Sequence, residues 1–241
     1  MAPPLVFAAV EAERNTLWKD AEVFGMKLCV LMGSPRREGN TAALLAPFLD
    51  ECGQMGVETH TIWLYGQGIG PCLGCMACQN CLDGLGCVQE DGFEAVFQEM
   101  AASDVILLAT PIYAFFCSAP MKALLDRMIY ASVKNYGRER GPKLLEGRRV
   151  ASLVTCGYPP EKGAGPWEEA LKLLCRYGGM EYMGMFCRRD RGGEVPFLDE
   201  DRERGVRDFA QVRADGVITK KVADQALCAL EIDYLGLDPV D

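Results

Sequence analysis

The sequence contains a single histidine, His60, and no apolar run that approaches the ~20 residues needed to span a bilayer. One histidine on a predicted edge strand nearly excludes Ser–His and Cys–His catalysis and histidine-based metal sites. Basic residues are outnumbered 25 to 34, and the resulting net charge of −9 disfavours nucleic acid and anionic membranes as partners. Cofactor chemistry is therefore the reasonable expectation.

The amino terminus lacks the basic region typical of a signal peptide, so we expect a cytoplasmic protein. Its twelve cysteines are then better interpreted as reduced thiols and ligands than as a disulfide framework. The first strong strand signal starts at Lys27. The predicted organisation is an extension over 1–25, one domain over 26–230 with a Cys-rich insertion at 66–90, and a tail over 231–241.

Strand and helix patterns alternate along the chain. Strands are expected at 27–32, 57–64, 104–109, 149–155 and 181–186, and helices near 41–52, 91–102, 120–129, 167–177 and within 207–230. This alternation predicts an α/β fold with a doubly wound five-stranded parallel sheet, and the half-polar second strand favours the order 2-1-3-4-5. Ligands bind such sheets at the carboxyl ends of the strands, where the loops at 33–41, 110–118 and 155–160 should converge.

The loop after the first strand reads G-S-P-R-R-E-G-N-T, from Gly33 to Thr41. Free amides at a helix start, hydroxyl and amide side chains and an arginine suit a phosphomonoester. Neither G-x-x-x-x-G-K-[ST] nor G-x-G-x-x-G occurs here, which argues against nucleoside triphosphate and dinucleotide loops. The alternative is an ordinary turn in which Asn40 or Thr41 caps the helix.

Five cysteines lie between Cys72 and Cys87, with the spacing C-x2-C-x2-C followed by Cys81 and Cys87. So many thiols within reach of one point indicate an iron–sulfur cluster, a zinc site or a thiol–disulfide relay. All three remain open at this point.

Three motifs follow one another along the chain: the G-S-P-R-R-E-G-N-T loop, the cysteine run, and T-P-I-Y-A-F-F-C-S-A-P-M-K-A-L-L-D-R from Thr110. Together they resemble the flavodoxin-like NAD(P)H-dependent FMN reductase superfamily, and within it the iron–sulfur flavoprotein branch. The resemblance covers roughly residues 26–190. It implies a flavodoxin-like fold, bound FMN, NAD(P)H as co-substrate, a small-molecule or protein electron acceptor, and a homodimer or tetramer.

The resemblance also implies a set of cofactor-binding residues. Ser34, Arg36, Asn40 and Thr41 would hold the FMN phosphate; Pro111, Ile112, Tyr113, Ala114 and Phe115 would lie against the isoalloxazine ring; Thr155 and Gly157 would supply the third loop. No side chain is expected to be catalytic, because the flavin carries the chemistry. Core packing is the alternative for Tyr113, Phe115 and Phe116.

In the iron–sulfur branch a [4Fe–4S] cluster is bound by C-x2-C-x2-C and a fourth cysteine, which implies Cys72, Cys75, Cys78 and Cys87 here. Cys87 is preferred to Cys81, because Gly84 and Gly86 let the longer loop fold back. Similar family members carry only flavin, so metal-free thiols and structural zinc stay open. A second functional hypothesis is an electron carrier that receives electrons from ferredoxin without using NAD(P)H.

The remaining candidates are expected to be structural. Lys122, Asp126 and Arg127 match the family pattern but are interpreted as pairs on a helix surface. Most other cysteines are expected to pack as small hydrophobic residues: Cys29, Cys52, Cys175, Cys187 and Cys228. Cys117 and Cys156 fall in the expected flavin-side loops, where burial is still the commoner outcome.

Overall fold

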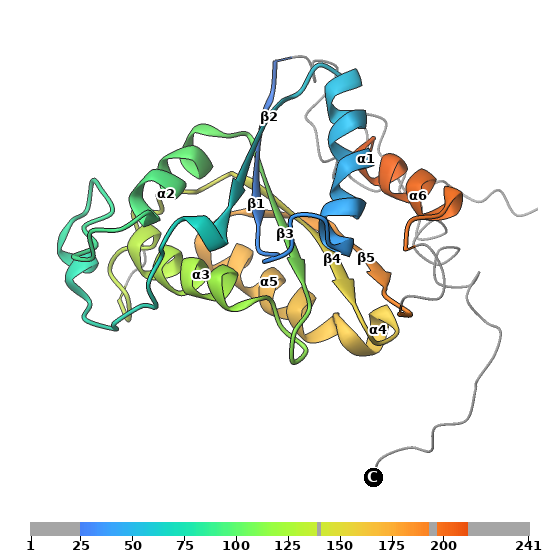
Figure 1. Ribbon diagram of the computed structural model, residues 1–241. Coiled ribbons are helices and arrows are strands. Elements are labelled where there is room, and N and C mark those ends of the chain that lie inside the picture. Colours follow the sequence, from blue (N-terminus) through green and yellow to red (C-terminus); the bar gives the residue numbers. More distant parts are fainter. Residues whose placement is uncertain (1–24, 139–140, 193–196, 212–241) are drawn as a thin grey trace, which may run out of the picture.

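The computed structural model describes residues 25–138, 141–192 and 197–211, which form a parallel sheet with helices on both faces (Figure 1). The strands run in the order β2-β1-β3-β4-β5, and every neighbouring pair is parallel. Their bounds are β1 Lys27–Met32, β2 Glu58–Trp63, β3 Val105–Pro111, β4 Arg149–Cys156 and β5 Glu181–Arg189. The predicted fold class and strand order are confirmed.

Burial along the strands explains this order. Every residue of β3 and of β4 is buried, as expected for apolar strands covered on both faces. By contrast, β2 exposes its first three residues, including His60, and lies at the edge of the sheet. The half-polar pattern that predicted an edge strand therefore identified it correctly.

The helices form two layers. Their bounds are α1 Asn40–Gln54, α2 Phe93–Ala102, α3 Ala119–Ser132, α4 Pro160–Gly163, α5 Gly165–Gly178 and α6 Glu200–Ala210, with short 3-10 turns η1 Leu64–Gly66 and η2 Ala77–Asn80. One face of the sheet packs against α2, α3 and α5, and the other against α1 and α6 (Figure 1). Among the described residues, no helix has the length and apolarity to cross a bilayer.

The last described helix differs from its prediction. The sequence predicts a charged loop over 188–206 and a helix somewhere within 207–230, but α6 already begins at Glu200, inside the predicted loop. The side chain of Asp199 caps it by accepting from the amide of Arg202, so a cap and an acidic first turn start the helix before any apolar pattern is visible. Residues 212–241, like 1–24, lie outside the described residues, and the predicted extension and tail stay predictions.

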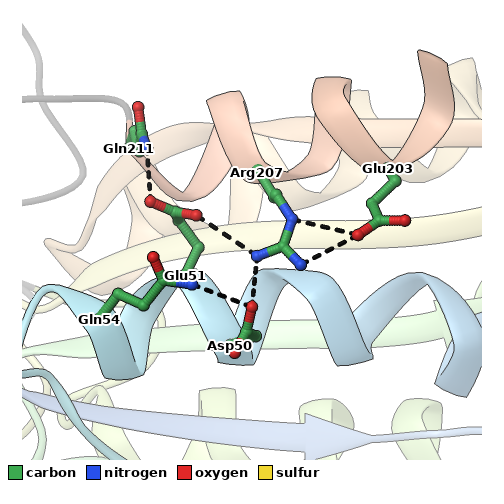
Figure 2. Close-up of polar contacts among 6 residues, drawn as sticks. All are labelled: Asp50, Glu51, Gln54, Glu203, Arg207 and Gln211. Carbon is green, nitrogen blue, oxygen red and sulfur yellow. Dashed lines mark hydrogen bonds and ion pairs between the residues drawn. The ribbon is translucent and has the colours of Figure 1, made fainter. Parts of the chain in front are cut away.

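Arg207 holds α6 against α1. Its guanidinium lies 2.5 Å from Asp50 Oδ2, 3.4 Å from Glu51 Oε2 and 3.0 Å from Glu203 Oε1. Figure 2 draws these contacts. Below this network Phe209 packs on both α1 and β5, so that the helix is joined by apolar as well as charged contacts. This corner lies on the opposite face of the sheet from α3 (Figure 1).

The cysteine-containing segment between β2 and α2 lies outside the two layers, beside α2 and α3 (Figure 1). Apart from η2 it has no regular secondary structure between residues 67 and 92. Gly86 has a φ of +64°, and a Cβ there would lie 2.4 Å from Cys81 Cβ. The expectation that glycine lets this loop fold back on itself is therefore confirmed at Gly86.

Candidate functional site

The loop between β1 and α1 ends in an uncapped helix. The N-cap of α1 is Gly39, which has no side chain to accept from the first amides, and the first turn contains no acidic residue. The alternative in which Asn40 or Thr41 caps the helix is therefore wrong, because both already lie inside it. Free amides and an uncompensated helix dipole favour an anion at this point.

Two side chains of this loop lie close to that helix start. Ser34 is buried, with Oγ 3.2 Å from the amide nitrogen of Arg36. The Arg36 side chain lies over Gly39, where an added Cβ would come within 3.0 Å of Arg36 Cβ and 3.2 Å of its Nε. Arg36 is nevertheless exposed and Asn40 is half-buried, so both can reach a ligand outside the loop.

Two hydrogen bonds join the three loops at the carboxyl ends of the strands. The hydroxyls of Thr41 and Thr155, both buried, lie 2.9 Å apart and connect the first loop to the third. The amide of Ile112 donates to the carbonyl of Thr155 at 2.8 Å and connects the second loop to the third. The loops predicted to converge there do so.

The second loop is a tight turn with an unusual backbone. Tyr113 and Phe116 exchange two backbone hydrogen bonds of 2.8 and 3.0 Å across the turn. Between them Ala114 and Phe115 have left-handed φ values of 47° and 64°. This conformation costs a residue with a Cβ about 1–2 kcal/mol, and such strain is concentrated at functional sites.

That turn separates the aromatic side chains into two groups. Phe116 packs edge-on against buried Trp167 at 5.4 Å and belongs to the core. Tyr113 and Phe115 point outward, 47% and 49% exposed, and Phe115 stacks on Tyr158 at 5.6 Å. Core packing is thus the role of Phe116, whereas the other two form an exposed aromatic surface.

Tyr158 was missing from the sequence-based site. It is 60% exposed and follows Gly157, which is also exposed, directly after β4. The sequence indicates this position, since loops that follow the carboxyl ends of buried parallel strands face the ligand site.

Four cysteines line one small cavity. Cys72, Cys75, Cys78 and Cys87 surround it together with Arg127 and Tyr130 of α3. Cys81 belongs to the described part of the chain but is not among the lining residues. The structure thus brings together the same four cysteines that the family resemblance implied, and Cys81 does not line the cavity.

The cysteines of this cavity influence one another. Burial raises the pKa of the Cys78 thiol, Lys134 lowers it, and the neighbouring Cys87, Cys72 and Cys75 raise it further. Within the described ranges, no three Cys, His, Asp or Glu side chains are grouped so that they could hold one metal ion. A zinc ion needs its sulfur ligands about 2.3 Å from a single point, whereas in a cubane each cysteine binds a different iron.

One structural assignment on α3 is wrong. Lys122 and Asp126 do pair on the helix surface at 2.6 Å, as predicted. Arg127, however, is buried and faces the cavity, where its guanidinium contacts Asp91 at 2.5 Å and Cys87 Sγ at 3.2 Å. Adjacent residues on a helix point about 100° apart, so a surface pair does not place the next residue on the surface.

The described cysteines outside the segment from Cys72 to Cys87 are buried, as expected. Burial raises the pKa to about 12 for Cys29, Cys52, Cys117 and Cys175. At the ends of β4 and β5 the sulfur atoms of Cys156 and Cys187 lie 3.4 Å apart; their hydrogen bond lowers the pKa of Cys156 and raises that of Cys187. Cys228 lies outside the described residues.

Known proteins resemble this chain in sequence and in fold. A model of the family described as NADPH-dependent FMN reductase matches residues 26–185. The chain is 32% identical to an iron–sulfur flavoprotein of Methanosarcina thermophila over 111 residues, 46% of this chain and 56% of that protein. A second iron–sulfur flavoprotein, from Archaeoglobus fulgidus, is 32% identical over 149 residues, 61% of this chain and 63% of that protein.

The chain spans about half to two thirds of the length of these curated flavoproteins. An 84-residue stretch is also 43% identical to the Holliday junction branch migration complex subunit RuvB of Mycobacterium leprae, and covers 35% of this chain but 24% of RuvB. So small a part of RuvB carries no argument about function.

The fold has a solved counterpart in the NAD(P)H:quinone oxidoreductase from Methanothermobacter marburgensis, with a TM-score of 0.59 and 17% identity over 78% of this chain and 96% of that one. At this identity the likeness concerns the fold alone. The family match, which covers both the loop before α1 and the strained turn after β3, identifies the chain: it belongs to the NADPH-dependent FMN reductase family, and it is similar to iron–sulfur flavoproteins.

Proposed function

We propose that this protein is an FMN-dependent oxidoreductase that takes electrons from NAD(P)H and passes them to a small-molecule or protein acceptor. The observation that carries the proposal is the convergence of three loops at one edge of the sheet. An uncapped helix start lies at one side of this edge, and exposed aromatic rings lie at the other. A phosphate and a flat apolar ring system are the two ends of FMN.

The first loop is proposed to hold the phosphate. The free amides of the first turn of α1 would donate to its oxygens, and Arg36 would neutralise its charge. Ser34, Asn40 and Thr41 add a hydroxyl, an amide and a second hydroxyl. Thr41 also fixes the position of the third loop through Thr155, so that anchoring the phosphate and shaping the ring site are coupled.

The second and third loops are proposed to hold the ring. Pro111, Ile112, Tyr113, Ala114 and Phe115 would lie along one edge, with Thr155 and Gly157 completing the site. When bound, the flavin supplies hydride acceptance and onward electron transfer. The residues orient it, and the exposed rings of Tyr113 and Phe115 cover apolar ring surface that would otherwise face water.

The four-cysteine cavity is proposed to bind a [4Fe–4S] cluster through Cys72, Cys75, Cys78 and Cys87. Their common cavity and the exclusion of Cys81 from its lining support this ligand set. A single zinc ion bound by these thiolates is the alternative occupant, and iron and sulfide analysis separates the two. We further propose a cytoplasmic homodimer or tetramer, by analogy with the family.

Anaerobic purification followed by absorption spectroscopy and iron and sulfide analysis tests both cofactors. We expect flavin bands with a broad visible shoulder, and equal amounts of iron and acid-labile sulfide. NADH or NADPH added without oxygen should then bleach the flavin bands.

The alternative function predicts a different outcome of the same titration. If reduced ferredoxin bleaches the flavin and neither nicotinamide does, the protein is an electron carrier and the NAD(P)H-dependent activity is rejected. If the purified protein binds no FMN when FMN is supplied to it, the whole proposal is wrong.

A further inference from the structure

Two cations that the proposed function does not use are buried at the cysteine segment: Arg127 lines the four-cysteine cavity, and Lys134 contacts the backbone carbonyls of Cys78 and Leu85. Arg127 is 2% exposed and Lys134, just beyond the end of α3, is 0% exposed. Lysine and arginine are almost never fully buried unless they are paired, because removing a charge from water is costly. Their positions therefore call for partners of opposite charge or strong hydrogen-bond acceptors.

Arg127 makes its contacts to the segment that bears the cysteines. Its Nη1 lies 2.5 Å from Asp91 Oδ2, and its Nη2 lies 3.2 Å from Cys87 Sγ. Longer bonds of 3.4 Å reach the carbonyls of Gly70 and Gln89. Its Nε is buried and has no hydrogen-bond partner within the described ranges. The arginine thus links the start of this segment, at Gly70, to its end, at Gln89 and Asp91.

Lys134 makes its contacts from the other side. Its Nζ donates to the carbonyl of Cys78 at 3.0 Å and to that of Leu85 at 3.2 Å. Asp83 and Cys81 act on it electrostatically, but no carboxylate of the described residues forms an ion pair with it. The charge of Lys134 is therefore solvated by backbone oxygens alone and acts on the cavity without a paired counter-ion.

We propose that Arg127 and Lys134 are positioning residues for the cavity's occupant: two buried cations, against the one partly buried counter-charge of Asp91, favour the more negative state of the cluster and raise its reduction potential. The inference rests on the proposed cluster. Four thiolate ligands outnumber the positive charge of an iron–sulfur core, so the centre is anionic, and one added electron makes it more so. In a desolvated site nearby charges act strongly.

A purely structural role for the two cations gives a different expectation. Loss of a structural contact would lower cluster content and stability for every variant. Charge balance instead predicts shifts of opposite sign, because Asp91 opposes Arg127. Asp91→Asn leaves the arginine uncompensated and should make the potential more positive, whereas Arg127→Gln and Lys134→Gln should make it more negative.

The experiment is an anaerobic spectroelectrochemical titration of the intact holoprotein and these three variants, with iron and sulfide measured for each. Lys122→Gln is the matched control, because it removes a cation from the same helix at an exposed surface pair. We expect each cavity variant to change the ratio of reduced to oxidised cluster about tenfold at a fixed potential, which for one electron is about 59 mV. Lys122→Gln should leave the ratio unchanged.

Several results overturn the inference, and they are distinguishable. A wild type without iron and sulfide removes the proposed cluster and this inference with it. If the wild type has a cluster but the variants leave its potential unshifted, the inference is wrong and the proposed cluster stands. The same holds if Asp91→Asn and Arg127→Gln shift the potential with the same sign. If Arg127→Gln does not fold, Lys134→Gln and Asp91→Asn decide the outcome by their opposite signs.

Discussion

The two candidate cofactor regions are built in different ways. The flavin edge consists of strand ends and short loops, joined by backbone bonds such as Ile112 to Thr155 and by one pair of hydroxyls. The cysteine segment has almost no regular structure, and two buried cations, Arg127 of α3 and Lys134 just beyond its end, hold it in place. A sheet satisfies its own polar groups, whereas an irregular loop needs donors supplied from elsewhere.

The largest expected effect comes from replacing single cysteines of the segment, which tests whether this region binds a cluster. Cys87→Ser should abolish stoichiometric iron and sulfide, because it removes one of four lining thiols. Cys81→Ser is the matched control on the same loop and should retain both, since Cys81 does not line the cavity. Iron and sulfide analysis of anaerobically purified variants measures the difference. Loss of the cluster in Cys81→Ser alone would reverse the assignment.

Removing the buried arginine should have the next largest effect. Arg127→Met leaves Asp91 without its partner and should lower the free energy of unfolding by about 3–5 kcal/mol. Lys122→Met, on the same helix, breaks an exposed pair and should cost about 0–1 kcal/mol. Urea denaturation of the two variants measures the contrast. Equal losses would contradict the view that buried charge holds the cysteine segment.

The contribution of the Arg127–Asp91 ion pair to stability should depend on pH. Burial alone would raise the pKa of Asp91, but hydrogen bonds from Arg127 and from the amides of Gly70 and Phe93 hold it below its ordinary value. A carboxyl with a depressed pKa stabilises the fold above its unfolded pKa of about 3.9, and this contribution is lost as pH falls through the folded pKa. The stability difference between wild type and Asp91→Asn should therefore be largest near neutral pH and shrink below pH about 4.

At the flavin edge the expected effect is on binding. Arg36→Gln removes a charged hydrogen-bond donor, a loss of about 1.5–3 kcal/mol that corresponds to roughly ten- to hundredfold weaker FMN binding. Arg37→Gln is the control, because Arg37 lies over the ring of Trp63 at 4.4 Å and is assigned no ligand. Fluorescence titration of the apoprotein with FMN measures both. Similar affinities for the two variants would count against the phosphate assignment.

The smallest expected effect concerns the strained turn. Ala114→Gly should not destabilise the protein and should stabilise it by up to about 1 kcal/mol, because glycine adopts the left-handed conformation without strain. Ala46→Gly, at an exposed position inside α1, should cost about 1 kcal/mol. Thermal denaturation of the two variants shows the sign. A loss at position 114 would mean that the side chain itself is needed.

The strands were predictable because the sequence pattern within each one indicates its own burial and its place in the sheet. β1 was predicted at its observed bounds, and the polar face of β2 identified the edge strand. The loop predicted over 188–206 was wrong in its last residues, because the Asp199 cap starts α6 at Glu200 while the prediction depended on apolar spacing.

The candidate sites were predictable only as far as local spacing reaches. Spacing brought the four cysteines together, and strand ends brought the three loops together. Arg127 was assigned to the helix surface and Lys134 was not singled out, since their roles depend on a segment that lies about 40 to 57 residues earlier in the chain. Tyr158 was overlooked although its place after β4 was visible.

The helix α3 begins directly after the strained aromatic turn, and Arg127 lies eight residues beyond its first residue, Ala119. Eight residues of α-helix rise about 12 Å and turn about 800°. One continuous helix therefore sets both the distance and the rotation between the aromatic turn and the four-cysteine cavity. Inserting or deleting a single residue between them would change the separation little but would rotate the arginine about 100° away from the cysteines.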